Sequence, residues 1–329
     1  MTFPLNVYLL AVISAGVTSA IALPLWRKQC LRAGVLDDPG QRKIHDQPIP
    51  LAGGLAVMTG LVVPTLAAVL LLAGPWRCLL DANATFLLRY GLGRRAFELG
   101  GILLGALGML VVGWVDDKRE LRPAAKFAGQ ILVAALVAAS GVRITLFVHS
   151  HLFHYAITIL WLLAVINAFN FMDNMNGLCA GLGAIGAWYF AFIAAADGQY
   201  LVALIAFATF GALAGFLPYN FPRASAFLGD AGSHLVGYLL AVLGILPHFY
   251  TPHHPRRWAV LIPLFVLAVP LLDMAYVVLL RWRIGKPFYI GDTNHLSHRL
   301  VRLGLSHTQA VLLILLLAAA SGALTLLVQ

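Results

Sequence analysis

Apolar stretches long enough to cross a membrane recur along the whole chain, separated by short polar connectors. A helix crosses the hydrocarbon core of a bilayer in about 20 residues. Of the 329 residues, 61% are hydrophobic and only 11% charged, whereas soluble domains carry roughly 25% charged residues. We therefore predict an all-α, polytopic integral membrane protein, a single domain over residues 1–329 with about ten transmembrane helices. The predicted spans are 3–25, 51–74, 97–114, 123–141, 155–170, 178–196, 200–217, 231–247, 259–280 and 308–328.

The charges of the connectors predict how these helices cross the membrane. Lys and Arg gather on one side, which the positive-inside rule assigns to the cytoplasm. We therefore expect a protein of the cell inner membrane with both termini on the outer face. The net charge of +9 has the same explanation, and no binding of nucleic acid is expected. Four arginines on the outer side depart from the rule: Arg77, Arg89, Arg94 and Arg95.

The acidic residues also choose a side. Of the 13 Asp and Glu residues, all but Asp81, Glu98 and Asp197 fall in or near the predicted inner connectors. Helix capping could account for some of them. It does not readily explain carboxylates in short turns between apolar spans, where ionisable groups are costly and usually functional. The inner face is therefore the expected site of chemistry.

The first of five polar segments at this face runs from Asp38 to Gly54 and contains Lys43 and His45. Its prolines and glycines indicate a shaped loop, and its two basic side chains are candidates for binding a phosphate or an anionic headgroup. The alternative is an ordinary basic loop attracted to anionic lipid.

The second segment places two adjacent carboxylates, Asp116 and Asp117, at the end of one span and Lys126 in the first turn of the next. This pattern offers a base or a metal-facing carboxylate together with a cation for phosphate. An acidic pair with a purely structural role at a helix end is the alternative.

The third and fourth segments add amide and carboxylate oxygens, which suit Mg2+. Residues 167–178 hold four asparagines and Asp173 among apolar residues, and the amides could also bind the edge of a uracil. Asp230 stands between glycines just before another span, where a helix N-terminus could bind a pyrophosphate. For the asparagine segment, a capped helix break is the structural alternative.

The fifth segment, residues 291–300, carries His295, His298 and Arg299 within one short loop. Binding of phosphate or proton transfer is plausible there. Zinc is the rival ligand, but no cysteine stands nearby.

These five segments, in this order and at these spacings, resemble the polyprenyl-phosphate N-acetylhexosamine-1-phosphate transferase family, glycosyltransferase family 4. The resemblance runs from about residue 38 to 307 and is closest to the bacterial undecaprenyl-phosphate GlcNAc-1-phosphate branch. It implies a bundle of ten or eleven helices, sometimes a homodimer, with a cleft at the cytoplasmic face.

The resemblance also implies roles for individual residues. Asp116 and Asp117 match paired aspartates near the lipid phosphate, one of them a proposed base. The remaining matches are Lys126 for phosphate, Asn170 and Asp230 for Mg2+ (or Mn2+), Asp173 as an active-site carboxylate, Asn176 near uracil, and His295 in contact with phosphate.

Three positions depart from the bacterial pattern, which usually has Asp at Asn176, Arg at Thr293 and His at Ser297. The last two changes remove positive charge near the sugar phosphate and leave the identity of the sugar open. The expected reaction transfers N-acetylhexosamine-1-phosphate, GlcNAc-1-phosphate first among the candidates, from a UDP-sugar to a polyprenyl phosphate. It releases UMP and begins a cell-envelope polysaccharide.

Two alternatives remain at this point. One is the phospho-MurNAc-pentapeptide transferase of peptidoglycan synthesis. The other is a transporter of lipid or solute, which many spans and an intramembrane Asp273 would also fit. The clustering of polar residues at one face argues against a transporter.

Overall fold

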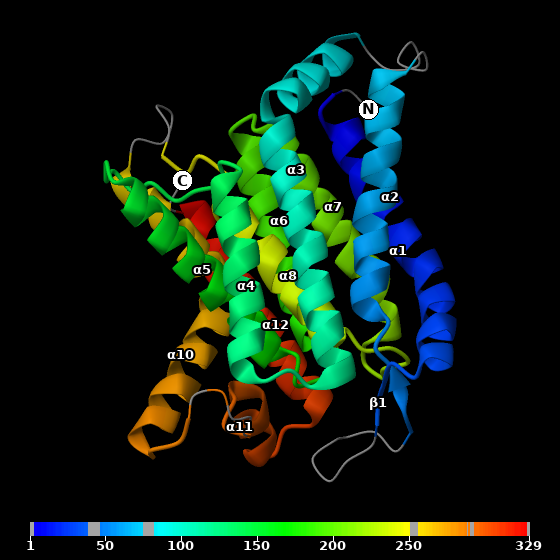
Figure 1. Cartoon of the computed structure of the whole chain (residues 1–329), viewed down its shortest axis with the longest axis vertical. Helices are drawn as coiled ribbons and strands as arrows, with labels where there is room; N and C mark the ends of the chain where they lie inside the picture. The colour runs from blue at the N-terminus through cyan, green and yellow to red at the C-terminus, as the bar shows by residue number, and fades with distance from the viewer. Residues whose placement is uncertain are drawn as a thin grey trace.

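The computed structural model describes residues 3–38, 47–74, 82–250, 256–287, 289 and 293–327. They form a helical bundle with one two-stranded antiparallel hairpin, which confirms the predicted all-α, polytopic class (Figure 1). The α-helices are α1 (Leu5–Ala33), α2 (Gly53–Ala73), α3 (Ala82–Arg119), α4 (Pro123–Ala139), α5 (His151–Met172), α6 (Leu178–Ala196), α7 (Tyr200–Phe216), α8 (Gly229–Leu243), α9 (Ile262–Val266), α10 (Ala268–Arg283), α11 (Leu296–Arg302) and α12 (His307–Leu324). Three 3-10 turns, η2 (Leu217–Tyr219), η3 (Arg257–Leu261) and η4 (Thr325–Leu327), and the strands β1 (Leu36–Asp37) and β2 (Ile49–Pro50) complete the described elements.

Each of the ten predicted spans coincides with helical structure, but fewer helices meet the length that a bilayer requires. Within the described residues, seven helices are long and apolar enough to cross a membrane. An eighth is obtained if η3 and α9 form one span with α10, to which they are bent by 74°. The 17 residues of α4 and the 15 of α8 are shorter than the roughly 20 that span the hydrocarbon core.

The short α8 is the centre of the bundle. It packs against α3 and α5, and also against α2 and α6. From Ala231 to Leu243 every residue is buried, so this helix meets other helices on all sides. A helix that is surrounded by other helices is apolar on all its faces, which explains the uniformly apolar sequence of α8.

Two glycine contacts bring backbones close to the first turn of α8. A Cβ on Gly54 of α2 would lie 2.6 Å from the backbone nitrogen of Gly232. A Cβ on Gly113 of α3 would overlap the carbonyl oxygen of Asp230. Only glycine permits such close approach, and the start of α8 is thereby fixed between α2 and α3.

The polar segments meet at one end of the bundle. α3 ends there, α4 and α8 begin there, and α11 lies at the same end, whereas α1 begins and α12 ends at the opposite one (Figure 1). This arrangement agrees with the predicted sidedness of the connectors. That the polar end faces the cytoplasm stays a prediction.

The hairpin β1–β2 lies against the loop before α8. Leu36 pairs with Pro50 and Asp37 with Ile49, and Phe227 donates its backbone N–H to Pro50 and accepts one from Gly53. Lys43 and His45, the predicted phosphate-binding residues of the segment between the strands, lie outside the described residues.

Candidate active site

The paired aspartates at the end of α3 have different partners. Asp116 is buried; one of its oxygens accepts the backbone N–H of Leu121 at 2.8 Å, and the other lies 2.7 Å from Nζ of Lys126. Asp117 accepts the backbone N–H groups of Asp230 at 2.7 Å and Ala231 at 3.0 Å. The first N–H groups of a helix have no partner within it, so Asp117 caps α8 from a different helix.

Lys126, in the first turn of α4, joins four helices. Besides Asp116, its ammonium lies 3.4 Å from Oδ2 of Asp230 on α8 and 3.4 Å from Oδ1 of Asn170 on α5. We call Asp116, Asp117, Lys126, Asn170 and Asp230 the four-helix cluster. Two of its three carboxylates contact the ammonium and the third, Asp117, accepts backbone N–H groups of α8, so with all three ionised the cluster has a net negative charge.

Asn170 and Asp230, the predicted metal ligands, are direct neighbours. The amide of Asn170 donates to Oδ1 of Asp230 and, at 2.9 Å, to Oγ of Ser233. Among the described residues, no group of three or more His, Cys, Asp and Glu could hold a metal ion. Mg2+ is commonly held by one or two carboxylates together with substrate phosphates and water. Asp230 and Asn170 offer oxygens of the type that such a site uses, and in the structure one oxygen of each contacts Lys126; their binding of Mg2+ stays a prediction.

Asp173 follows the last turn of α5 and lies in the electrostatic field of the cluster. Burial, and then the carboxylates of Asp230 and Asp117, raise the pKa of Asp173 well above its ordinary value. A carboxyl group in this environment favours its protonated form. The negative charge of Asp173 is therefore costly, and its role as an active-site carboxylate stays a prediction.

The turn between α5 and α6 is tied to two other segments. Asn176 donates its amide to the carbonyl of Pro222 at 3.2 Å, and Gly177 donates its N–H to Oδ1 of Asn220 at 2.8 Å. Asn174 accepts a hydrogen bond from Oγ of Ser297 at 2.8 Å. The described contacts give Asn176 a role in holding the turn, and its proximity to uracil stays a prediction.

The described part of the fifth segment, residues 293–300, which we call the histidine loop, lies at the same end of the bundle, next to α5 and α10. Nδ1 of His295 lies 2.7 Å from Oδ2 of Asp273, and the imidazole packs edge-on against Phe171, with 5.4 Å between ring centroids. Phe171 directly follows Asn170 in the chain, so the residue that His295 packs against is the sequence neighbour of a residue of the four-helix cluster.

His298 and Arg299, the other predicted residues of this loop, lie on α11. The guanidinium of Arg299 stacks over the ring of Tyr276 on α10, 4.6 Å from its centroid. Burial, and then the neighbouring His295 and Arg302 side chains, lower the pKa of His298. Both residues are held at the polar end, and their contact with substrate stays a prediction.

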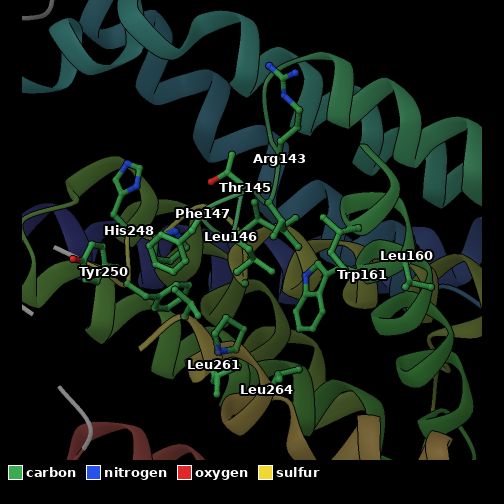
Figure 2. Close-up of a pocket in the computed structure, with 18 of the residues that line it drawn as sticks. Arg143, Thr145, Leu146, Phe147, Leu160, Trp161, His248, Tyr250, Leu261 and Leu264 are labelled. Carbon is green, nitrogen blue, oxygen red and sulfur yellow. The ribbon is translucent and has the colours of Figure 1, made fainter. Parts of the chain in front are cut away.

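A cavity of about 760 Å³ lies at the other end of the bundle, between the start of α5 and the η3–α9 segment. Figure 2 shows Phe147, His248 and Tyr250 gathered at one side of it, with the guanidinium of Arg143 directed away from the apolar side chains. Neither Asp nor Glu is among its described lining residues. This cavity is distinct from the candidate active site.

Comparisons with known proteins decide the family. Glycosyl transferase family 4 matches residues 99–248. The "Probable undecaprenyl-phosphate N-acetylglucosaminyl 1-phosphate transferase" of Bacillus subtilis is 30% identical over 315 residues, which cover 93% of this chain and 81% of that protein. The "Decaprenyl-phosphate N-acetylglucosaminephosphotransferase" of Mycolicibacterium smegmatis is 32% identical over 339 residues, with 95% and 80% covered. The "Undecaprenyl-phosphate alpha-N-acetylglucosaminyl 1-phosphate transferase" of Escherichia coli K12 is 27% identical, with 94% and 80% covered.

The chain belongs to glycosyl transferase family 4. It is an enzyme of the prenyl-phosphate GlcNAc-1-phosphate transferase family within it, which confirms the resemblance and removes the transporter alternative. The region matched by glycosyl transferase family 4 contains the whole four-helix cluster, from Asp116 to Asp230. His295 lies beyond it.

Sequence reasoning missed several contacts of the candidate site. Ser233 and Asn174 were not singled out, although each hydrogen-bonds to a polar residue of the candidate site or the histidine loop. The sequence marks Asp273 only as a charge within the predicted span 259–280 and does not predict its contact with His295. The signal that could have identified Asp273 is its isolation: a carboxylate within an apolar helix requires a partner, and the histidine loop begins shortly after that helix.

Proposed function

We propose that this protein transfers GlcNAc-1-phosphate from UDP-GlcNAc to a polyprenyl phosphate and releases UMP. The observation that carries the proposal is the position of Lys126, whose ammonium lies between Asp116, Asp230 and Asn170 at the polar end of a membrane bundle. The names of the relatives, which include undecaprenyl- and decaprenyl-phosphate GlcNAc transferases, support this donor and this class of acceptor.

Phosphoryl transfer requires mainly positioning and neutralisation of charge. A phosphate oxygen of the lipid attacks the phosphorus that carries the sugar, a new P–O bond forms, and the bond to the bridging oxygen breaks. UMP leaves with that oxygen and with the electron pair of the broken bond. The attacking oxygen already carries charge, so the step needs cations near the phosphates more than it needs a base.

Lys126 and His295 supply positive charge and hydrogen-bond donors for these phosphates. Asp230 and Asn170 would hold Mg2+, or Mn2+ with the same oxygen ligands, and the ion would neutralise pyrophosphate charge. The negative charge of the four-helix cluster supports such a cation. Asp116 fixes Lys126 through its 2.7 Å contact, and the ammonium is thereby held beside Asn170 and Asp230.

Asp117 acts in this scheme as a support and not as a base or nucleophile. Both of its oxygens accept backbone N–H groups of α8, which makes its lone pairs less available for attack on phosphorus. This contact favours direct attack by the lipid phosphate over a covalent phosphosugar intermediate on Asp117.

The cellular setting follows the same reasoning. The polar end faces the cytoplasm, where the basic connectors are expected, and the product begins a cell-envelope polysaccharide. The alternative donor, a UDP-MurNAc-pentapeptide, is less favoured because the relatives named above all carry GlcNAc in their names.

The test measures UMP release by purified protein with Mg2+, undecaprenyl phosphate and one UDP-sugar at a time: UDP-GlcNAc, UDP-GalNAc or UDP-MurNAc-pentapeptide. We expect the highest rate with UDP-GlcNAc and loss of turnover in Lys126→Met. The matched control is Lys118→Met, because Lys118 is exposed on α3 and stacks over Trp114. Absence of UMP with every donor would overturn the proposal.

A further inference from the structure

Asp273 is a buried carboxylate within α10, and only 6% of its surface is exposed. α10 is part of the bent η3–α9–α10 segment that can count as one membrane span. Burying a charge in such a segment is costly unless hydrogen bonds satisfy it. Asp273 has no part in the proposed reaction.

The partners of Asp273 both come from the histidine loop. Its Oδ2 lies 2.7 Å from Nδ1 of His295, and its Oδ1 accepts the backbone N–H of Leu296 at 2.6 Å. One carboxylate therefore holds both the ring of His295 and the backbone at the start of α11. The loop is separated from Asp273 by 22 residues of sequence, so this is a tertiary contact and not a local turn.

The contact determines which ring nitrogen of His295 is available. A carboxylate accepts hydrogen bonds, so Nδ1 carries the proton that it donates to Asp273 and Nε2 is the nitrogen left for another partner. The ring is held from a second side by Phe171 at 5.4 Å, and Phe171 in turn lies under the guanidinium of Arg281 at 5.1 Å. His295 is thus fixed in both orientation and tautomer.

We propose that Asp273 is a positioning residue: by accepting the Nδ1 proton of His295 it directs Nε2 toward the phosphate oxygens of the substrates, to which the doubly protonated, positively charged ring donates its Nε2 proton. This inference rests on the proposed function, in which His295 contacts phosphate. Asp273 acts through His295 and does not itself touch substrate. Removing a residue that orients a metal-ligating histidine in the same way commonly lowers metal affinity or activity about 10- to 100-fold, and we expect a loss of the same order here.

The first test replaces the carboxylate without changing its size. In Asp273→Asn the amide oxygen can accept from Leu296, which turns the NH2 group toward Nδ1, disfavours a proton on that nitrogen and so disfavours the positively charged ring that the phosphates require. We expect kcat to fall about 10- to 100-fold with little change in KM for the UDP-sugar, and Asp273→Glu to recover part of the loss. Leu272→Ala is the matched control, because Leu272 adjoins Asp273 on α10 and is 69% exposed.

A double-mutant comparison separates positioning from general support of the fold. If Asp273 acts through His295, then Asp273→Asn lowers the activity of the wild-type protein but not that of His295→Gln. An equal fold-loss in both backgrounds, or an equal loss of kcat in Leu272→Ala, would overturn the inference.

A spectroscopic measurement needs neither substrate nor a variant at Asp273. With 15N-labelled histidine, and with His295→Gln used to assign the signal, nuclear magnetic resonance should show the proton on Nδ1 of neutral His295. Neutral His295 with its proton on Nε2 would overturn the inference even if Asp273→Asn fails to fold. Failure of the wild-type protein to release UMP would instead contradict the proposed function and leave the tautomer result intact.

Discussion

The carboxylate of Asp117 accepts the backbone N–H of Asp230 at 2.7 Å, and this bond joins the end of α3 to the start of α8. Its second oxygen accepts the N–H of Ala231. The side chain of Asp230 enters the four-helix cluster from the same turn. Asp117 therefore positions α8, the helix that carries the candidate metal ligand Asp230. Its neighbour Asp116 holds Lys126.

Asp117→Asn should destabilise the fold and slow the reaction. The amide can accept one of the two N–H groups, but its NH2 then faces the other, and an unsatisfied buried donor costs about 1–3 kcal/mol. Thermal unfolding and kcat measure the two effects. Glu98→Gln is the control, since its ion pair with Arg95 is partly exposed and such pairs contribute about 0–1 kcal/mol. Equal unfolding temperatures for the two variants would contradict the capping role of Asp117.

Gly229→Ala should disturb the same junction from the other side. Gly229 has a φ of +68°, and a Cβ there would lie 2.8 Å from Oδ2 of Asp117. A non-glycine residue in this conformation costs of order 1–3 kcal/mol. Gly93→Ala, where an added Cβ meets no atom within 4 Å, should leave the unfolding temperature unchanged or raise it. Equal unfolding temperatures for Gly229→Ala and Gly93→Ala would contradict this effect.

The stability of the protein should depend on pH through Asp173. Burial raises the pKa of Asp173 well above its ordinary value, so the folded state binds this proton more tightly than the unfolded chain does. Wild-type protein therefore loses stability as pH rises from the unfolded value of about 3.9 through the raised folded pKa, and then loses no more. Asp173→Asn cannot ionise. Its unfolding temperature, relative to wild type, should rise with pH across that window, and a difference that does not change with pH would exclude this effect.

Much of this site could be predicted because its residues are chemically unusual for their surroundings. Asp116, Lys126, Asn170 and Asp230 are polar groups beside apolar spans, and the structure brings these four together. Their pairing could not be predicted, because it depends on which helices pack against α8. The two oxygens of Asp117, for example, are used by a helix more than 100 residues later in the chain.

The span count and Asp273 show two other limits of the sequence. A hydropathy pattern cannot distinguish a helix that faces lipid from one that is enclosed by other helices, and α8 is enclosed. Asp273 suggested a transport path by its depth in an apolar segment. Its hydrogen bond to His295 depends on the approach of the histidine loop to α10, which no local pattern encodes.

Asp230→Ala should raise the Mg2+ concentration that gives half-maximal activity, by about tenfold or more if one of two protein ligands is lost. Asp197→Asn, at the end of α6 on the opposite side of the bundle, should leave that concentration unchanged. UMP release is measured over a Mg2+ titration. An unchanged half-maximal concentration in Asp230→Ala would remove Asp230 from the metal site.

The most direct measurement of the central claim follows the β-phosphorus of the donor. Purified protein is incubated with Mg2+, undecaprenyl phosphate and UDP-GlcNAc that carries radioactive phosphorus at the β position, and the lipid and water-soluble products are separated. Transfer of GlcNAc-1-phosphate predicts that the label moves into the lipid in equal amount to the UMP released, and that Lys126→Met abolishes both. Label that remains in the aqueous phase as UDP, or lipid that gains GlcNAc without the label, would contradict the account.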